Sequence, residues 1–309
     1  MIPGKTIRIV GITCHFGDSF WIEKAIHTLS QLNIVSKLYI SDQIGTGLLD
    51  NCQYEPLRLK DYGIPKEIVR VNEFSNTHAS FQHAHSIKMI AERIAQNSEI
   101  YDFVLLFDSD VVFRRNFLEQ LSVLDQSYAY LAQDGINKLH SHPCFQLIPF
   151  QAFLQLNYAP IRIRTVLQKE LLVDTGRLIH LQLINLGKRP ILIDVKTQSR
   201  IFAFQFPDTY FPNDSILHFK SMSFSKRPDA VARFGITDFM KYEFGKFLAL
   251  LITRTSINDV VPSQAFKKRA VVFKFLFYCL LDSQVYKVLF HDLFRGLQGI
   301  AKKLIGRKI

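Results

Sequence analysis

Short runs of apolar and β-branched residues alternate with amphipathic segments along most of the chain. The runs at residues 6–12, 37–40 and 68–71 are each typical of a strand. Between and after them, apolar residues recur at helical spacing in residues 22–32 and 87–94. Strands that alternate with helices in this way predict an α/β domain built on a parallel sheet.

The unbroken apolar run at residues 103–107 is the strongest strand signal, and it is followed by two acids, Asp108 and Asp110. Such a run is typical of a strand that is buried on both faces. Ligands of open α/β sheets bind where strands end. Side chains two apart on an extended strand point the same way, so the two carboxylates can converge on one cation. We therefore predict a site for Mg²⁺ or Mn²⁺, with a pair of solvated loop acids as the alternative.

An apolar strand that ends in Asp-x-Asp resembles the DxD motif of glycosyltransferases with the GT-A fold. The strand–helix–strand start of the chain resembles family 2 of these enzymes. In that family the motif holds a divalent metal against the diphosphate of a nucleotide sugar. The resemblance implies that Asp108 and Asp110 are metal ligands and that Asp108 belongs to the nucleotide-sugar site. It also implies a GT-A domain with a mostly parallel central sheet, at about residues 1–239.

The same resemblance implies further contacts to the nucleotide sugar. In family 2 the first loop and an Asp after the second strand hold the base and ribose, and the matching residues are Thr13 and Asp42. We expect residues 13–17 to form a loop and residues 41–47 to form a turn, so an ordinary turn residue is the alternative for Asp42.

Three histidines lie at or near the start of the helix that contains residues 87–94. We expect His78 to contact phosphate, with an ordinary surface histidine as the alternative. A zinc site is the other hypothesis for this cluster. His83 and His85 are two residues apart on a helix and face different directions, which argues against their binding one ion together.

Residues 107–112 also resemble the first motif of haloacid-dehalogenase-type phosphatases, in which Asp108 would be a nucleophile and Asp110 a general acid and base. That motif opens its domain, whereas here a complete strand–helix–strand unit precedes it. The phosphatases also need a later pair of adjacent acids, and Asp208 and Asp214 are isolated. These differences favour the transferase.

Asp174 precedes a helical pattern that Gly187 closes. Asp is a good helix N-cap, so a structural cap is one interpretation. The segment Asp174-Thr175-Gly176 also resembles the acidic motif that carries the catalytic base of inverting GT-A enzymes. A helix N-terminus favours the ionised carboxylate, which suits a group that must accept a proton.

His218 follows a short apolar run late in the predicted catalytic domain. Its place after Asp110 and Asp174 matches the position at which many GT-A enzymes supply a third metal ligand. A nitrogen ligand beside two carboxylates suits Mn²⁺ as well as Mg²⁺. A histidine with a purely structural role is the alternative.

The positive charge of the chain is concentrated at its C-terminal end. The net charge is +11, and residues 240–309 contain thirteen bases against four acids, which is +9. Apolar residues recur at helical spacing after Asp282 with bases between them, which predicts a basic amphipathic extension on an anionic membrane surface. Helices folded back onto the catalytic domain are the alternative, and no recognisable module indicates nucleic acid.

The 309 residues are 48% hydrophobic, enough for a sizeable core. The four cysteines are scattered without CxxC spacing, and we expect no signal peptide, since Met-Ile-Pro-Gly-Lys leads directly into a predicted strand. We expect reduced thiols that act as small hydrophobic groups, and a cytoplasmic protein that is either free or peripheral on the inner face of the cell membrane. No apolar stretch reaches the roughly 20 residues that a membrane-spanning helix needs.

These observations predict a glycosyltransferase that moves a sugar from a nucleotide-diphosphate donor to a glycan or a lipid-linked acceptor. We expect inversion at the anomeric carbon, dependence on Mn²⁺ or Mg²⁺, and a role in cell-envelope polysaccharide synthesis. The alternatives are the phosphohydrolase and a non-catalytic protein that binds a membrane surface or nucleic acid.

Overall fold

The computed structural model groups the chain into two compact units. The first unit is Met1–Thr197 with Asp208–Ser223, and the second is Gln198–Pro207 with Phe224–Ile309. The structure describes residues 7–15, 19–43, 57–71, 79–97, 99–114, 117–121, 124–135, 139–159, 161–164, 170–197, 200–201, 204–210, 214–219, 231–253 and 265–280. The predicted amphipathic segment after Asp282 and the predicted phosphate contact His78 lie outside these residues.

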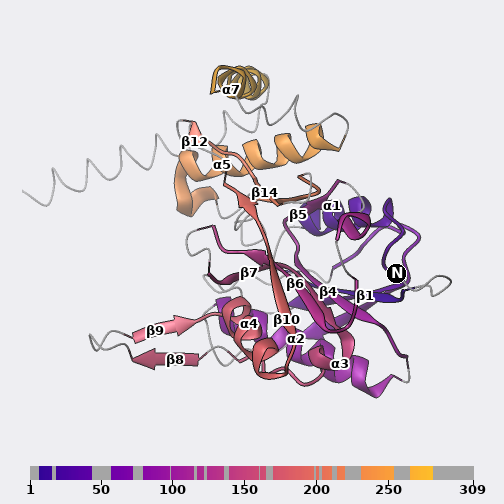
Figure 1. The fold of residues 1–309 in the computed structure, drawn as a ribbon. Helices are drawn as coiled ribbons and strands as arrows, with labels where there is room; N and C mark the ends of the chain where they lie inside the picture. Colours follow the sequence, from indigo (N-terminus) through magenta and orange to yellow (C-terminus); the bar gives the residue numbers. More distant parts are fainter. Residues whose placement is uncertain are drawn as a thin grey trace, which may run out of the picture. The chain divides into compact units, whose positions relative to one another are not determined.

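The elements of the first unit alternate between strands and helices (Figure 1). They are β1 (Ile9–His15), α1 (Ser19–Ser30), β2 (Lys37–Gln43), β3 (Lys66–Val71), α2 (Ala79–Gln96), β4 (Phe103–Asp108), β5 (Val111–Phe113), the 3₁₀ turn η1 (Phe117–Gln120), β6 (Tyr128–Gln133), β7 (Ser141–Pro149), α3 (Phe150–Phe153), β8 (Ile161–Arg164), β9 (Glu170–Val173), α4 (Thr175–Asn185), β10 (Arg189–Ile193), β11 (Val195–Lys196), β14 (Asp208–Tyr210) and β15 (Ile216–His218).

A seven-stranded sheet in the order β10-β6-β7-β4-β1-β2-β3 forms the centre of the first unit. Its strands pair in parallel except at β7, which runs antiparallel to both of its neighbours. The predicted α/β class with a mostly parallel central sheet is therefore confirmed. Strand β4 lies in the interior of this sheet, and every residue of its apolar run is buried.

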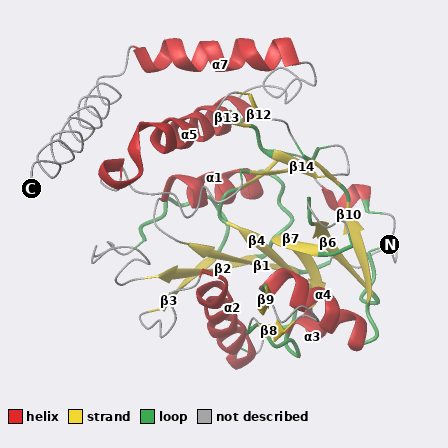
Figure 2. Cartoon of the chain, turned by 90° about the vertical axis from the view of Figure 1, so that its left-hand side faces the viewer, coloured by secondary structure: helices red, strands yellow, loops and turns green. Residues whose placement is uncertain are grey.

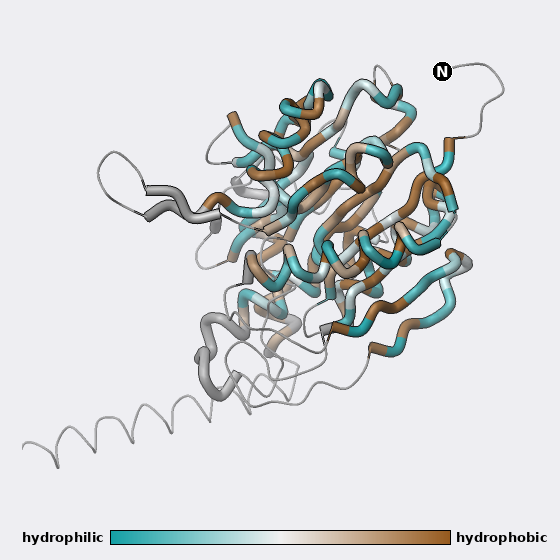
Figure 3. Tube along the Cα trace, turned by 90° about the horizontal axis from the view of Figure 1, so that it is seen from below, coloured by the Kyte–Doolittle hydropathy of each residue, from teal (hydrophilic) through white to brown (hydrophobic). Residues whose placement is uncertain are grey.

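Helices cover both faces of the sheet, with α1 on one face and α2, α3 and α4 on the other (Figure 2). One hydrophobic cluster joins α1 to the strands, and a second joins the other helices to the opposite face. In the hydropathy colours of Figure 3 the central strands are mostly hydrophobic, whereas the helices alternate between hydrophobic and hydrophilic residues. Burial on both faces explains why the strands read as apolar runs rather than alternating patterns.

Two predicted connections are wrong, because the strands run further than their apolar runs. Strand β1 continues to His15, and β2 continues to Gln43, although a loop and a turn were expected there. In the parallel register His15 lies opposite Asp42. Polar residues without a strand signal of their own therefore adopt strand conformation here, because the neighbouring strand supplies their backbone hydrogen bonds.

A smaller sheet beside the carboxyl end of β4 has the order β11-β14-β15-β5. Strand β5 follows β4 after a turn at residues 109–110 and pairs antiparallel with β15, which sets Val111 opposite His218. The backbone N–H of Phe219 also donates to the carbonyl of Asp110 at 3.1 Å. This pairing carries His218 to the end of the DxD strand.

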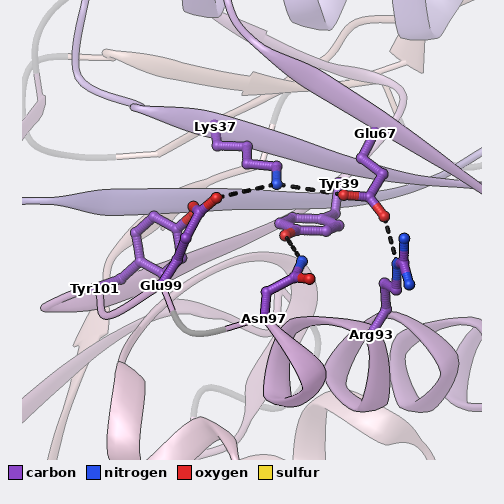
Figure 4. A network of polar contacts seen from close by, with 7 residues as sticks. All are labelled: Lys37, Tyr39, Glu67, Arg93, Asn97, Glu99 and Tyr101. Atoms are coloured by element: carbon purple, nitrogen blue, oxygen red, sulfur yellow. Dashed lines mark hydrogen bonds and ion pairs between the residues drawn. The ribbon is translucent and has the colours of Figure 1, made fainter.

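A polar network ties helix α2 to the far end of the sheet (Figure 4). Arg93 donates to Glu67 at 2.6 Å, and Asn97 donates to the hydroxyl of Tyr39 at 2.7 Å. Lys37 lies 3.3 Å from Glu67 and 4.7 Å from the ring centre of Tyr39. The network lies at the start of β2 and β3, opposite the carboxyl ends that hold the candidate site, and fixes the helix that carries His83.

The second unit contains the hairpin of β12 (Arg200–Ile201) and β13 (Phe204–Gln205) and the helices α5 (Val231–Ile252) and α7 (Ala265–Leu280). Phe244 and Phe275 are fully buried, with ring centres 5.2 Å apart, and Phe204 packs against both. Helix α5 runs through residues 239–240, where the sequence predicted a boundary. Among the described residues, no helix is both long and apolar enough to cross a membrane.

Candidate active site

Asp108 and Asp110 lie at the carboxyl end of β4, in the middle of the sheet. Asp108 is the last residue of the strand, and Asp110 lies in the turn that follows it. The strand conformation that would point both side chains the same way does not continue past Asp108, because Ser109 already lies in the turn. The ligand atoms of Asp108, Asp110 and His218 nevertheless all lie within 4.8 Å of one another. The turn brings the carboxylates together in a different way from the strand alternation that the sequence suggested.

His218 approaches this pair of acids from strand β15. Its Nε2 atom lies 3.5 Å from Oδ1 of Asp110 and 3.8 Å from Oδ2 of Asp108. Asp110 and His218 are almost completely buried, with exposed fractions of 1% and 3%. Asp108 is less enclosed, since 22% of its side chain is exposed. The three side chains form one buried cluster that is open to solvent on the Asp108 side.

The pKa values in this cluster reflect burial and the repulsion of like charges. Burial and, less strongly, the neighbouring Asp110 raise the pKa of Asp108 to about 7, and His218 opposes this rise. Burial alone would lower the pKa of His218, but Cys144 and Asp110 together raise it well above its usual value. Two carboxylates this close are difficult to ionise together without a compensating cation.

A divalent cation fits this arrangement. Two carboxylates and one imidazole are ligands that Mn²⁺ and Mg²⁺ accept, and a bound cation would relieve the repulsion between Asp108 and Asp110. Small movements of the side chains would bring atoms that lie within 4.8 Å of one another to the separations typical of shared ligands. Asp108, Asp110 and His218 are therefore a candidate metal site.

His83 on helix α2 faces the same cluster from the other side. Its Nε2 atom lies 3.8 Å from Oδ1 of Asp108 and has no hydrogen-bond partner among the described residues. Burial lowers the pKa of His83 to about 4, so the ring is neutral at physiological pH. The sequence reasoning treated His83 only as part of a zinc cluster with His85, and it missed this contact because only the packing of α2 on the sheet creates it.

Asp174 is the N-cap of helix α4. Its Oδ1 atom accepts the backbone N–H of Arg177 at 2.9 Å. The Asp174 charge is also close enough to raise the pKa of Asp108, although burial and Asp110 contribute more. The start of α4 is held against β7, because Ser141 donates to the carbonyl of Gly176 at 2.7 Å. Asp174 therefore caps helix α4 and also lies near the acidic cluster, so the structural role does not exclude a role in the site.

Thr13 and Asp42 end up in strands at the same edge of the sheet as Asp108. Thr13 is fully buried, and its hydroxyl has no hydrogen-bond partner among the described residues. Asp42 is 3% exposed and accepts the backbone N–H of Leu57 at 2.8 Å. Burial raises the pKa of Asp42, whereas that hydrogen bond and Arg70 oppose the rise. Asp42 therefore anchors the backbone of Leu57 to the end of β2.

Strand β7 adds two residues that the sequence reasoning did not connect with the site. The potential ligand atoms of His142, Cys144 and His218 lie within 4.8 Å of one another. The cysteines were expected to be small hydrophobic groups, and Cys14, Cys144 and Cys279 are buried thiols. The available signal was the spacing of His142 and Cys144, because residues two apart on a strand share a face.

No protein-family model and no curated protein matches this sequence. Solved structures give weak similarities. The mannosyltransferase PcManGT from Pyrobaculum calidifontis, in complex with GDP-Man and Mn²⁺, is 10% identical with a TM-score of 0.42, over 98% of this chain and 81% of that one. The glycosyltransferase GlyE of Streptococcus pneumoniae TIGR4 is 16% identical with a TM-score of 0.35, over 60% of this chain.

A glycosyltransferase involved in the glycosylation of the major capsid of PBCV-1 is 13% identical with a TM-score of 0.29, over 47% of this chain and 61% of that one. This chain spans 45% of the length of GlyE. All three structures are described as glycosyltransferases. With identities of at most 16% and TM-scores below 0.5, the assignment of an activity rests on the geometry of the site.

Proposed function

We propose that this protein is a metal-dependent glycosyltransferase that uses a nucleotide-diphosphate sugar. The observation that carries the proposal is the cluster of Asp108, Asp110 and His218, whose ligand atoms lie within 4.8 Å of one another. The cluster stands at the carboxyl edge of a mostly parallel sheet, where α/β folds bind their ligands. A buried acidic cluster attracts a cation, and a cation there can attract a diphosphate.

Asp108, Asp110 and His218 would hold Mn²⁺ or Mg²⁺, which neutralises negative charge on a diphosphate leaving group when bound. Thr13 and Asp42 lie at the same edge and are proposed to face the nucleoside, as the resemblance implies. His78 is proposed to contact phosphate. Asp42 is buried and bonded to Leu57, which supports an indirect role in nucleotide binding, through the position of Leu57.

Asp174 is the proposed general base. Its carboxylate lies near Asp108, at the N-terminus of α4. A base at this place would remove the proton of the acceptor hydroxyl while that oxygen attacks the anomeric carbon. One such base and a single displacement give inversion, which we propose for this enzyme.

The proposed acceptor is a glycan or a lipid-linked glycan of the cell envelope, reached from the cytoplasmic surface of the membrane. Phe273 and Phe277 support contact with an anionic membrane, since they lie one turn apart on α7 and are 62% and 64% exposed. Arg269 and Lys274 are also exposed on this helix. Aromatic rings flanked by bases are typical of a helix face at an anionic lipid surface.

Calorimetry with nucleotide-diphosphate sugars tests the proposed function. The full-length protein should bind one class of donor in the presence of Mn²⁺ and lose that binding in EDTA. Asp110→Asn should also lose it, whereas Glu92→Gln, which removes an exposed charge from α2, should bind as wild type does. Release of inorganic phosphate from phosphate esters, without any donor binding, would instead indicate the phosphohydrolase.

A further inference from the structure

Strand β7 places a histidine and a cysteine beside the imidazole that completes the carboxylate cluster. The rings of His142 and His218 have their centres 5.0 Å apart. The thiol of Cys144 neighbours the ring of His218 closely enough that each group shifts the pKa of the other. Two imidazoles and a thiol form a donor set different in kind from the two carboxylates and one imidazole of the proposed metal site.

We propose that His142, Cys144 and His218 form a second cation site, selective for a thiophilic ion such as Zn²⁺ or Cd²⁺. Their potential ligand atoms lie within 4.8 Å of one another. In a tetrahedral zinc site with typical bond lengths, neighbouring ligand atoms are about 3.5 Å apart. A contraction of roughly 1 Å, within the reach of side-chain rotation, would therefore complete the site.

The chemistry of the donors selects the ion. Thiolate and imidazole together favour Zn²⁺ and Cd²⁺ over Mg²⁺ and Mn²⁺, which prefer oxygen. Binding would displace to solvent the proton of the Cys144 thiol and any proton on the imidazole nitrogens that coordinate, because thiolate and neutral imidazole are the ligands. Two positive charges from the ion against one thiolate leave a net positive site, and the nearby carboxylates of Asp108 and Asp110 would stabilise it.

One existing contact must change for His142 to bind. Its Nδ1 atom accepts the backbone N–H of Cys144 at 3.1 Å, which holds the ring beside the thiol of the same strand. A neutral ring that accepts at Nδ1 carries its proton at Nε2. Coordination through Nδ1 would replace this hydrogen bond, and coordination through Nε2 would move the proton to Nδ1 and so end it as well. A single neutral hydrogen bond is weak compared with coordination in a thiolate site.

His218 belongs to both sites, and this sharing gives the inference its functional consequence. A neutral imidazole has one nitrogen with a free lone pair, because the other carries a proton. His218 can therefore serve only one cation at a time. Zn²⁺ or Cd²⁺ at His142 and Cys144 would remove the nitrogen ligand from the carboxylate site and weaken its hold on Mn²⁺. This consequence rests on the proposed function, whereas the thiolate site itself does not.

Titration of the metal-free full-length protein with Cd²⁺ tests the thiolate site directly. A thiolate bound to Cd²⁺ absorbs in the ultraviolet by charge transfer, so no enzymatic activity is needed. Wild type should show this absorption with one equivalent of Cd²⁺, and Cys144→Ser should lose it. Cys14→Ser is the matched control, since Cys14 is equally buried and belongs to no ligand cluster among the described residues.

His142→Gln provides a second test that does not alter the fully buried Cys144. It should weaken Cd²⁺ binding by about tenfold or more, the cost typical of losing support at a metal site. The fluorescence of Trp21, which is buried and packs 5.0 Å from Phe219, reports whether each variant is folded. Absence of the absorption in folded wild type, or unchanged binding by folded His142→Gln, would overturn the proposal.

Displacement of Mn²⁺ separates this inference from the proposed function. The electron paramagnetic resonance signal of free Mn²⁺ should increase as Cd²⁺ is added, with a midpoint about tenfold higher for His142→Gln than for wild type. A Cd²⁺–thiolate absorption without any Mn²⁺ binding would support the thiolate site and contradict the proposed function. Bound Mn²⁺ without a Cys144-dependent absorption would do the reverse.

Discussion

Replacing Asp110 by asparagine should stabilise the metal-free protein at neutral pH while it abolishes Mn²⁺ binding. In the folded protein, burial and the neighbouring Asp110 raise the pKa of Asp108 from 3.8 to about 7. The folded state therefore binds a proton that the unfolded state has lost between these two values. Stability must fall as the pH rises across this window, and the loss is complete above about pH 7.

The size of the effect follows from the shift and from the distance between the acids. A shift of about three pKa units corresponds to about 4 kcal/mol of lost stability. The part due to Asp110 is a repulsion across at most 4.8 Å, which is at least about 3.5 kcal/mol at an effective dielectric constant of about 20. His218 loses a counter-ion in the variant, which offsets part of this gain. We therefore expect Asp110→Asn to be about 1–2 kcal/mol more stable than wild type at pH 7.5 in EDTA.

Urea unfolding of the EDTA-treated proteins at about pH 5 and pH 7.5 measures this difference. Trp21 is the single tryptophan, lies in the unit that carries the site, and is 1% exposed, so its fluorescence follows that unit. Glu92→Gln controls for the loss of one negative charge at an exposed position. The reasoning is refuted if wild-type stability does not fall between the two pH values, or if Asp110→Asn is the less stable protein at the higher one.

Three further changes have definite expected outcomes. The Asp174→Asn variant keeps much of the capping ability, so it should fold and bind the donor normally. It should transfer sugar about 10²–10⁴-fold more slowly, and NMR should show an inverted product. A near-normal rate would leave Asp174 as a helix cap only. Gly176→Ala would place a Cβ atom 2.7 Å from the backbone nitrogen of Pro143. It should lower the free energy of unfolding in urea by about 1–3 kcal/mol. Unchanged stability would contradict the close approach of α4 to β7. Replacing Phe273 and Phe277 together by serine should reduce sedimentation with anionic vesicles, whereas undiminished sedimentation would argue against α7 as the lipid-facing element.

Much of the fold could be predicted from local patterns. The apolar run at residues 103–107 became the interior strand β4, and the helical spacing in residues 22–32 and 87–94, both earlier in the chain, became α1 and α2. These predictions hold because burial on both faces of a sheet, or on one face of a helix, leaves its period in the sequence. Asp108 and Asp110, which follow that apolar run, were predicted to lie at the carboxyl edge of the sheet because ligands of such sheets bind where strands end.

The tertiary structure decided which side chains meet those acids. His218 reaches Asp110 through the pairing of β15 with β5, and His83 reaches Asp108 through the packing of α2. His142 and Cys144 come close to His218 only because β7 runs antiparallel beside β4. The sequence determined the elements, since hydrophobic burial acts on neighbours along the chain. Contacts between distant segments depend on strand order and register, which no local pattern of residues encodes.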